Sequence, residues 1–177
     1  MNIPSKSPIR KNAKLRPWLW PIRLMCKSWR NPVPPGLWII NKFYQNVLDI
    51  NNDVPWMVHF TSSVTGAITI GKDVWKSFAL SGGCYMQGGN GIVIGDNTIF
   101  AQGVKIISAN HDPLNYKVWL IEKPIIIGKN CWIGSNSVIL PNVELGDNVI
   151  VGAGSIVTKS FPSGSTIVGN PAKILSK

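Results

Sequence analysis

Residues 127–162 read IGKNCW, IGSNSV, ILPNVE, LGDNVI, VGAGSI and VTKSFP, and these consecutive hexads decide the fold. Each hexad begins with an aliphatic residue, from Ile127 to Val157 in steps of six. Six is the period of neither a helix nor a strand, so the repeating unit is a short strand followed by a bend. The aliphatic side chain points inward, and Gly, Asp or Asn lets the chain turn. Three hexads close one triangular coil, and successive coils stack at the strand spacing of about 4.8 Å.

The same register extends upstream of this stretch. Steps of six lead from Ile106 back to Val58, although the frame is weak over residues 76–91, where a frame shifted by two residues fits as well. The hexads together predict an all-β solenoid, a parallel β-helix of about five triangular coils, over residues 58–177. Residues 169–177 are expected to leave the last coil as a tail.

The register breaks once inside the solenoid. From Ile106 to Ile127 is 21 residues, which is three hexads plus three residues. Residues 110–124, NHDPLNYKVWLIEKP, therefore leave the coil as a loop. A loop that leaves an otherwise regular solenoid indicates a functional insertion, and this one begins beside His111, one of two histidines in the chain.

Residues 1–57 lack the six-residue period and form a separate N-terminal arm. Behind Pro35 and Gly36, the pattern predicts a helix near residues 37–49. Its apolar residues share one helical face: Leu37, Ile40, Tyr44, Val47 and Leu48.

The arm also holds nearly all of the net charge of +10. Residues 1–48 contain nine Lys and Arg and no acid, whereas the rest of the chain has nine Lys against eight acids. Four tryptophans, Trp18, Trp20, Trp29 and Trp38, are interleaved with these cations. This composition is typical of an anchor on anionic lipid; the alternative is that the tryptophans pack on the solenoid and the cations are solvated.

Composition excludes several classes of protein. Three cysteines without metal-type spacing indicate neither a disulfide framework nor a zinc finger and fit a cytoplasmic protein. No stretch has the features of a signal peptide or approaches the roughly 20 apolar residues of a membrane span. Nucleic-acid binding is disfavoured because the positive charge is confined to the arm and no recognised nucleic-acid module occurs.

Three blocks in order make the chain resemble the hexapeptide-repeat acyltransferases, in particular the branch of galactoside, maltose and capsule or colanic-acid O-acetyltransferases. They are IGDNTIFAQGVKIISANH, the stretch from PIIIGKNCW to VTKSFP, and GNPAKIL. The resemblance implies a left-handed coil and a homotrimer. It also implies that acetyl-CoA lies in a groove between adjacent prisms, with each active site shared between chains.

The resemblance assigns His111 as the catalytic base. A neutral imidazole with a pKa near its ordinary value of about 6.5 is suited to take the proton of an acceptor hydroxyl and return it to the CoA thiolate. Asp112 follows directly; it either orients an imidazole or contacts the acceptor, or it caps the turn before Pro113.

Further positions carry over to the donor and the acceptor. Those expected along acetyl-CoA are Trp132, Ser135, Ala153, Thr158, Lys159 and Lys173, with the Ser135 backbone N–H as oxyanion donor. The acceptor-binding asparagine of the galactoside branch is not matched here, and Asn90 is a candidate substitute, with Tyr116 and Trp119 of the loop as further acceptor contacts.

The sequence thus predicts O-acetylation of a sugar hydroxyl in capsule, exopolysaccharide or lipopolysaccharide synthesis. The glycan acceptor is lipid-linked in one version of this hypothesis, which would put the enzyme at the inner face of the cell membrane. Rival acceptors are an amino sugar, serine or an antibiotic. A γ-type carbonic anhydrase shares the prism but needs three histidine ligands per zinc, so no metal is expected here. A non-catalytic scaffold is the other alternative.

Overall fold

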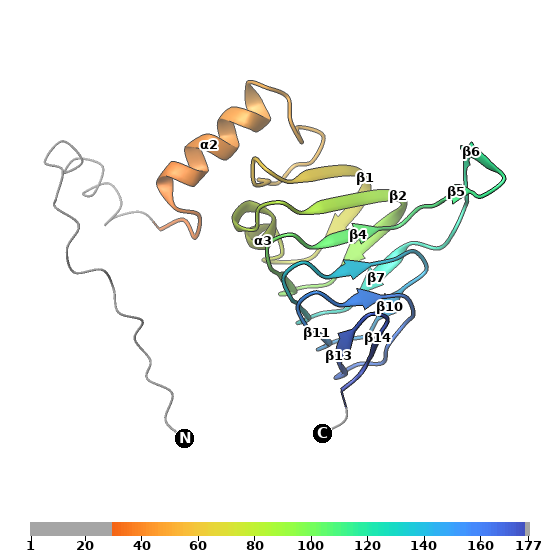
Figure 1. The fold of residues 1–177 in the computed structure, drawn as a ribbon. Coiled ribbons are helices and arrows are strands. Elements are labelled where there is room, and N and C mark those ends of the chain that lie inside the picture. Colours follow the sequence, from red (N-terminus) through yellow and green to blue (C-terminus); the bar gives the residue numbers. More distant parts are fainter. Residues whose placement is uncertain (1–29, 176–177) are drawn as a thin grey trace, which may run out of the picture.

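The structure is a computed structural model, and it describes residues 30–175. Its main body is a stack of short parallel strands, with a helix at one end and a hairpin protruding from one edge (Figure 1). In chain order the elements are α2 (Pro35–Asn46), β1 (Ser63–Ile70), α3 (Trp75–Leu80), β2 (Tyr85–Ile94), β3 (Ile99–Phe100), β4 (Lys105–Ile107), β5 (His111–Asp112), β6 (Asn115–Trp119), β7 (Ile125–Ile127), β8 (Trp132–Ile133), β9 (Val138–Ile139), β10 (Glu144–Leu145), β11 (Ile150–Val151), β12 (Ile156–Val157), β13 (Thr166–Gly169) and β14 (Ala172–Ile174).

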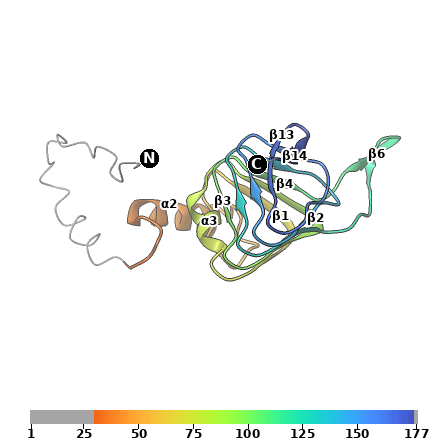
Figure 2. The same ribbon diagram turned by 90° about the horizontal axis from the view of Figure 1, so that it is seen from below.

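Strand pairing divides this body into three walls, which Figure 2 shows end-on. The first wall, here the β8 wall, has the order β14-β13-β11-β8-β3. The second contains β4, β9 and β12, and the third contains β7 and β10. The long strands β1 and β2 turn the corner between the second and third walls, since β2 pairs with β4 through its first residues and with β7 through its last. The predicted parallel β-helix is therefore observed.

Asparagine makes five of the tight corners of the solenoid, and Gly and Asp make others. A side chain in the left-handed region is strained for most residues, but Asn tolerates it. Positive φ angles occur in the solenoid at Asn97, Asn130, Asn136, Asn142 and Asn148, each within a few degrees of 60°. The sequence expectation that Gly, Asp or Asn turns the chain is thus met at these corners, where Asn adopts the left-handed conformation.

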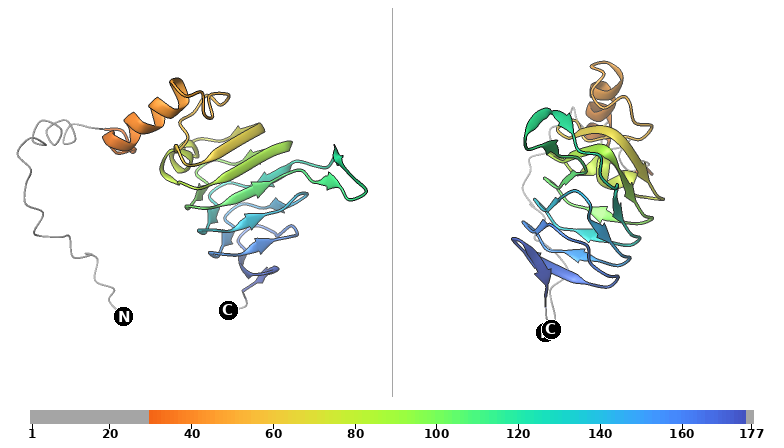
Figure 3. Two further views of the ribbon diagram at one scale, coloured as in Figure 1. Left: turned by 45° about the horizontal axis from the view of Figure 1, so that its top comes forward. Right: turned by 90° about the vertical axis from the view of Figure 1, so that its right-hand side faces the viewer.

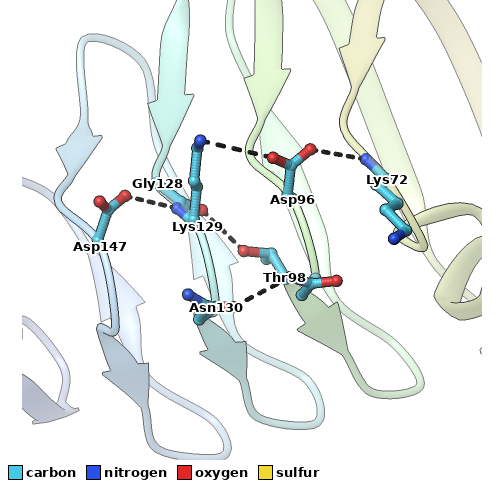
Figure 4. A network of polar contacts seen from close by, with 8 residues as sticks. Lys72, Asp96, Thr98, Gly128, Lys129, Asn130 and Asp147 are labelled. Carbon is cyan, nitrogen blue, oxygen red and sulfur yellow. Dashed lines mark hydrogen bonds and ion pairs between the residues drawn. The ribbon is translucent and has the colours of Figure 1, made fainter.

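Polar contacts join one coil to the next at a corner (Figure 4). Asp96 accepts a hydrogen bond from the Lys72 backbone N–H at 2.8 Å and lies 3.5 Å from the Lys129 ammonium. Asp147 accepts from the Lys129 N–H at 2.7 Å in the same way. The Lys72 N–H bond, more than the ion pair, lowers the pKa of the Asp96 carboxyl.

The core is the ladder of aliphatic residues that the hexads predict. Ile133, Ile139 and Val157 are fully buried, and Ile127, Leu145 and Val151 are 1% exposed. A second buried position recurs in each hexad, and in the first five hexads it is occupied by smaller residues: Cys131, Ser137, Val143, Val149 and Ser155 are all buried. Burial of side chains of this size stabilises the fold by about 1.5–3 kcal/mol each relative to exposure.

The weak part of the sequence frame contains a helix instead of a strand. Residues 75–80 form α3, which the hexad pattern did not predict, and it puts Phe78 into the core at 1% exposure. The Phe78 ring meets the Phe100 ring edge-on at 4.8 Å. Of the two frames open in the sequence, the shifted one through Phe78 and Cys84 gives the buried residues.

Helix α2 lies at the end of the stack beside the first coils (Figure 1) and forms most of the segment 37–49 that was expected to be helical, ending at Asn46. Pro35 occupies its first turn, where a missing N–H costs nothing. Its fully buried residues are Asn41 and Gln45, whereas Ile40, Val47 and Leu48 of the predicted apolar face are exposed. The basic, Trp-rich segment with Trp18, Trp20 and Trp29 lies outside the described residues.

The expected loop at residues 110–124 leaves the stack between β4 and β7, and it contains an antiparallel hairpin of β5 and β6 (Figure 3). At the other end of the chain, the expected tail is in part a strand. β14 turns back and pairs antiparallel with β13, Val168 facing Lys173, so it extends the β8 wall.

Candidate active site

His111 lies at the base of the hairpin and is exposed to solvent. Its ring packs against Trp119 of the opposite strand, with the ring centroids 4.0 Å apart and the planes at 37°. Trp119 is half exposed itself, so the pair offers an imidazole on an apolar support. Trp119 was expected to contact an acceptor, and its observed contact is with the candidate base.

Asp112 caps the hairpin turn. Its Oδ1 accepts a hydrogen bond from the Leu114 backbone N–H at 2.7 Å, which closes an Asx turn over Pro113. Of the readings left open by the sequence, turn capping is the one for which this chain supplies a contact.

Both stems of the hairpin are tied to β2 through Asn90. The Asn90 amide Nδ2 donates to the backbone oxygens of Ser108 and Leu120, each at 3.0 Å. Ser108 precedes the hairpin and Leu120 follows it, and the Asn90 N–H donates to the Ser108 hydroxyl at 3.0 Å. Asn90, expected as an acceptor contact, thus uses its amide N–H groups to hold the hairpin.

A separate feature lies on the β8 wall. An open depression of ≈ 310 Å³ runs along β8 and β11. It is lined by Ala101, Trp132, Gly134, Ser135, Ile150, Val151, Gly152 and Ala153. The lining is mostly apolar side chain and backbone, and its polar side-chain groups are the Ser135 hydroxyl and the Trp132 indole N–H.

Three residues expected along the donor, Trp132, Ser135 and Ala153, are brought together here. Trp132 is 55% exposed although it lies in a strand, so its indole stands on the surface of the wall. Among residues 30–175 no hydrogen-bond acceptor meets the Ser135 backbone N–H, which leaves it available to a ligand.

Glycine forms part of the floor of the depression because neighbouring coils approach it closely. A Cβ on Gly134 would lie 2.6 Å from the Ala153 backbone nitrogen, and one on Gly152 would lie 2.6 Å from Val168 Cγ1. Sequence reasoning missed Ala101, Gly134 and Gly152 as lining residues. The strand register could have identified them. Each lies two positions after an outward-facing residue of β3, β8 or β11, and these outward-facing residues are paired across the wall.

The remaining predicted residues lie toward the C-terminal end. Thr158, Lys159 and Lys173 are exposed, and Lys173 is on β14, in the same wall as the depression. The Lys159 ammonium lies 5.7 Å from the centre of the Phe161 ring. Tyr116 of the hairpin is 76% exposed, with its ring free to meet a ligand or a partner chain.

The hairpin and the depression are not on the same side of the molecule. Figures 1 and 2 show the hairpin projecting from the prism on the side away from α3 and β3, whereas β3 pairs with β8 in the wall of the depression. A single chain therefore does not bring His111 together with Trp132 and Ser135.

Three buried or half-buried groups outside this site have shifted pKa values. Burial raises the thiol pKa of Cys84 and of Cys131, which makes both poor nucleophiles. Burial lowers the pKa of His59, whose Nδ1 lies 2.9 Å from the Thr61 hydroxyl. Across residues 30–175, no cluster of three or more His, Cys, Asp or Glu is arranged to hold a metal ion.

The chain is similar to known transferases. The sequence profile described as bacterial transferase hexapeptide (six repeats) matches residues 124–159. A protein of Staphylococcus aureus (strain COL), named as a predicted acetyltransferase, is 34% identical over 143 residues, which are 78% of this chain and 68% of that protein. Galactoside O-acetyltransferase of Escherichia coli (strain K12) is 36% identical over 112 residues, or 61% of this chain. The chain spans only 53% of the length of that enzyme.

Solved structures give the same relationship. A hexapeptide-repeat acetyltransferase from Vibrio cholerae, solved in complex with acetyl coenzyme A, superposes with a TM-score of 0.54 at 27% identity. The superposition covers 66% of this chain and 63% of the other. Fold, repeat and sequence agree in these comparisons.

Proposed function

Because the chain belongs to the bacterial hexapeptide-repeat transferase family, we propose that it is an acetyl-CoA-dependent O-acetyltransferase that acts on a sugar hydroxyl. The observation that carries this proposal is the depression on the β8 wall, where Trp132, Ser135 and Ala153 surround an unpaired backbone N–H. The Vibrio cholerae relative binds acetyl coenzyme A, and the Escherichia coli relative is named for a galactoside acceptor.

The depression suits the acetyl and pantetheine end of the donor. Pantetheine is a narrow chain with apolar segments and two amides, which match an apolar wall with exposed backbone groups. Thr158, Lys159 and Lys173 lie toward the C-terminal end, and the two ammonium groups would meet phosphates. The Ser135 N–H would stabilise the oxyanion that forms when the thioester carbonyl is attacked.

In this mechanism His111 acts as a general base and then as a general acid. The imidazole takes the hydroxyl proton while the acceptor oxygen bonds to the thioester carbonyl carbon. When the C–S bond breaks, the imidazolium returns that proton to the CoA thiolate. Trp119 packs against the His111 ring. This contact restricts the orientations that the imidazole can adopt, so less freedom is lost when it meets the acceptor hydroxyl.

The separation of hairpin and depression supports a site made by two chains. In a cyclic homotrimer of left-handed prisms, the hairpin of one protomer would reach the β8 wall of its neighbour. Three equivalent sites would result. The His111 imidazole would then close over a donor bound mainly by the adjacent chain.

A glycan acceptor fits the exposed aromatic residues of the hairpin, Tyr116 and Trp119, since aromatic faces pack well against sugar rings. We place the reaction in the cytoplasm, in capsule, exopolysaccharide or lipopolysaccharide synthesis, with a lipid-linked glycan as one form of the acceptor. No helix among residues 30–175 has the length and apolar character needed to cross a bilayer.

The test measures acetyl transfer from radiolabelled acetyl-CoA to a panel of acceptors. The panel contains galactosides, lipid-linked glycans, amino sugars, serine and an antibiotic that carries a hydroxyl group. We expect sugar hydroxyls to be acetylated, and His111→Ala to lower kcat by about 10²–10⁴-fold with donor affinity retained. His59→Gln is the matched control, because His59 is the other histidine and lies outside the hairpin.

Equal turnover by wild type and His111→Ala would refute the proposed base. Preference for serine or an amine would refute the sugar hydroxyl and leave the donor site intact. Failure to bind CoA in a calorimetric titration would favour a non-catalytic scaffold.

A further inference from the structure

Helix α2 buries polar as well as apolar residues and leaves a row of large apolar residues exposed. Its buried polar residues are Asn41, with no exposure, and Gln45, at 6%. On the other face, Ile39 is 58% exposed, Phe43 is 49% exposed and Val47 is 62% exposed. A surface helix of a soluble domain normally points such residues into the core.

Hydrogen bonds hold the helix in this rotation. The Asn41 amide donates to the Ala79 oxygen and accepts from the Phe60 N–H, both at 3.0 Å. Both polar groups of the buried Asn41 amide therefore have partners outside the helix.

Gln45 is satisfied as completely. It donates to the backbone oxygens of Trp56 at 2.9 Å and Asn51 at 3.0 Å, and its oxygen accepts from the Val58 N–H at 3.1 Å. Rolling the helix to bury its exposed apolar residues would leave these backbone groups without their hydrogen-bond partners, which is unfavourable for buried groups. The hydrogen bonds of Asn41 and Gln45 therefore fix the rotation of the helix that leaves Ile39, Phe43 and Val47 exposed.

The exposed face is a continuous stripe. Ile39, Phe43 and Val47 follow one another at a spacing of four, which puts them in a row along one side of the helix. Ile40 at 42%, Leu48 at 47% and Ile50 at 39% exposure widen this row. Figures 1 and 3 show α2 at the end of the stack, leaning away from the walls. A contiguous exposed apolar surface of this kind marks an interaction site.

The charge of the surrounding chain selects the partner. Arg30 and Lys42 are the charged residues of the described part up to the end of α2, and both are cations. The whole of residues 1–48 contains nine Lys and Arg without one acid. An apolar helical face accompanied by many cations matches an anionic bilayer surface, where the cations are attracted to the headgroups and the apolar side chains enter the interface. A protein partner would not require this one-sided charge.

We propose that the stripe of α2 and the turn after it, made of Ile39, Ile40, Phe43, Val47, Leu48 and Ile50, docks on an anionic lipid bilayer with the helix parallel to the membrane surface. The inference is independent of the acetyl-transfer reaction. It would hold the N-terminal end of the prism at the membrane and leave the β8 wall and the hairpin in water.

Co-sedimentation of the full chain with large unilamellar vesicles tests this proposal. On vesicles of one part phosphatidylglycerol to three parts phosphatidylcholine we expect saturable binding. On pure phosphatidylcholine the partition coefficient should fall at least tenfold, and rising salt should weaken the binding.

The double variant Ile39→Gln/Phe43→Gln should lose at least tenfold in partition on the anionic vesicles, since Gln keeps helix propensity while removing apolar area. The matched control is Val93→Thr/Ile126→Thr, which alters two apolar residues of similar exposure, 40% and 38%, on a wall distant in sequence. Its partition should equal that of the wild type. Far-ultraviolet circular dichroism and calorimetric CoA titration check that both variants are folded.

Equal binding of the two double variants would overturn the proposal. So would absence of wild-type binding together with a fall in oligomeric mass of Ile39→Gln/Phe43→Gln by analytical ultracentrifugation, because the stripe would then be covered by a second copy of the chain.

Discussion

At the scale of single residues, Asn90 is a polar side chain that holds the hairpin in place, although the sequence suggested that it binds the acceptor. Its amide bridges the two stems of the hairpin at Ser108 and Leu120. The same residue type would also suit a sugar, and the sequence alone does not distinguish these roles, because both require an amide near the loop. Hydrogen-bond partners 18 and 30 residues away decide the matter.

Loss of the Asn90 amide should disturb the placement of His111. For Asn90→Ala we expect kcat to fall by about 10–100-fold, because small displacements of a catalytic group are costly, while the KM for acetyl-CoA stays near the wild-type value. The pH profile should keep its shape, since the base itself is unchanged. Steady-state kinetics with both substrates varied make this measurement.

Asn115→Ala serves as the comparison, because Asn115 lies in the exposed hairpin, where its side-chain oxygen accepts one hydrogen bond within residues 30–175, from the Lys117 N–H at 3.2 Å. We expect a change of less than about threefold there. A raised acceptor KM with unchanged kcat in Asn90→Ala would instead identify Asn90 as an acceptor contact.

At the scale of elements, the six-residue period was sufficient to predict parallel strands, Asn corners and the ejected loop. It did so because inward Ile, Leu and Val and left-handed Asn are local requirements of each coil. It did not predict α3, since residues 75–80 carry no hexad signal of their own and are helical because Phe78 fills the end of the core. It also left open which face of α2 is buried. Periodicity shows which residues share a face, whereas burial depends on the partners that Asn41 and Gln45 find in distant segments.

The corner at Asp96 gives the fold a dependence on acid. The folded-state pKa of Asp96 is lowered, chiefly by the Lys72 N–H and also by Lys129. Its ionised form therefore stabilises the fold at pH values above the ordinary Asp pKa of about 3.9, and this contribution is lost as pH falls through the lowered value.

Asp96→Asn should consequently have a lower melting temperature than wild type at pH 7, and the difference should vanish toward pH 2. Because Asp96 is exposed, the effect should be modest. Thermal melts of both proteins between pH 2 and 7 provide the comparison. Glu144→Gln is the control, as Glu144 is an exposed carboxylate without a resolved ion pair in the described residues. A pH-independent difference for Asp96→Asn would rule out its charge as the cause.

At the scale of the whole molecule, the sequence predicted the components of the site but not their separation. His111, Trp132, Ser135 and Ala153 could each be named from the motif blocks. The hairpin projects away from the depression because the loop leaves the prism between β4 and β7, whereas the depression lies along β8 and β11. The hexad pattern does not show how these two positions are arranged in space. Subunit contacts, which the chain alone does not contain, would have to reunite them.

Co-expression of two inactive variants tests this reunion. His111→Ala lacks the base, and Ala153→Trp should obstruct the depression. If each site takes its hairpin from one chain and its depression from the next, random trimers formed at equal expression should recover about a quarter of wild-type sites. If both parts come from one chain, the mixture should stay inactive. Labelled acetyl transfer by the purified mixed trimers gives the answer, with each variant alone as the reference.

The return of β14 along β13 has a further effect on how the protein exists in solution. A stack of parallel strands exposes at its last coil a row of unpaired backbone groups in the same register as every earlier coil, and such an edge is a template for another molecule. Because β14 pairs antiparallel at Val168 and Lys173, it occupies that edge with a strand of the opposite direction. On the β8 wall, the short C-terminal strand therefore replaces a parallel edge with a strand that does not continue the register of the coils.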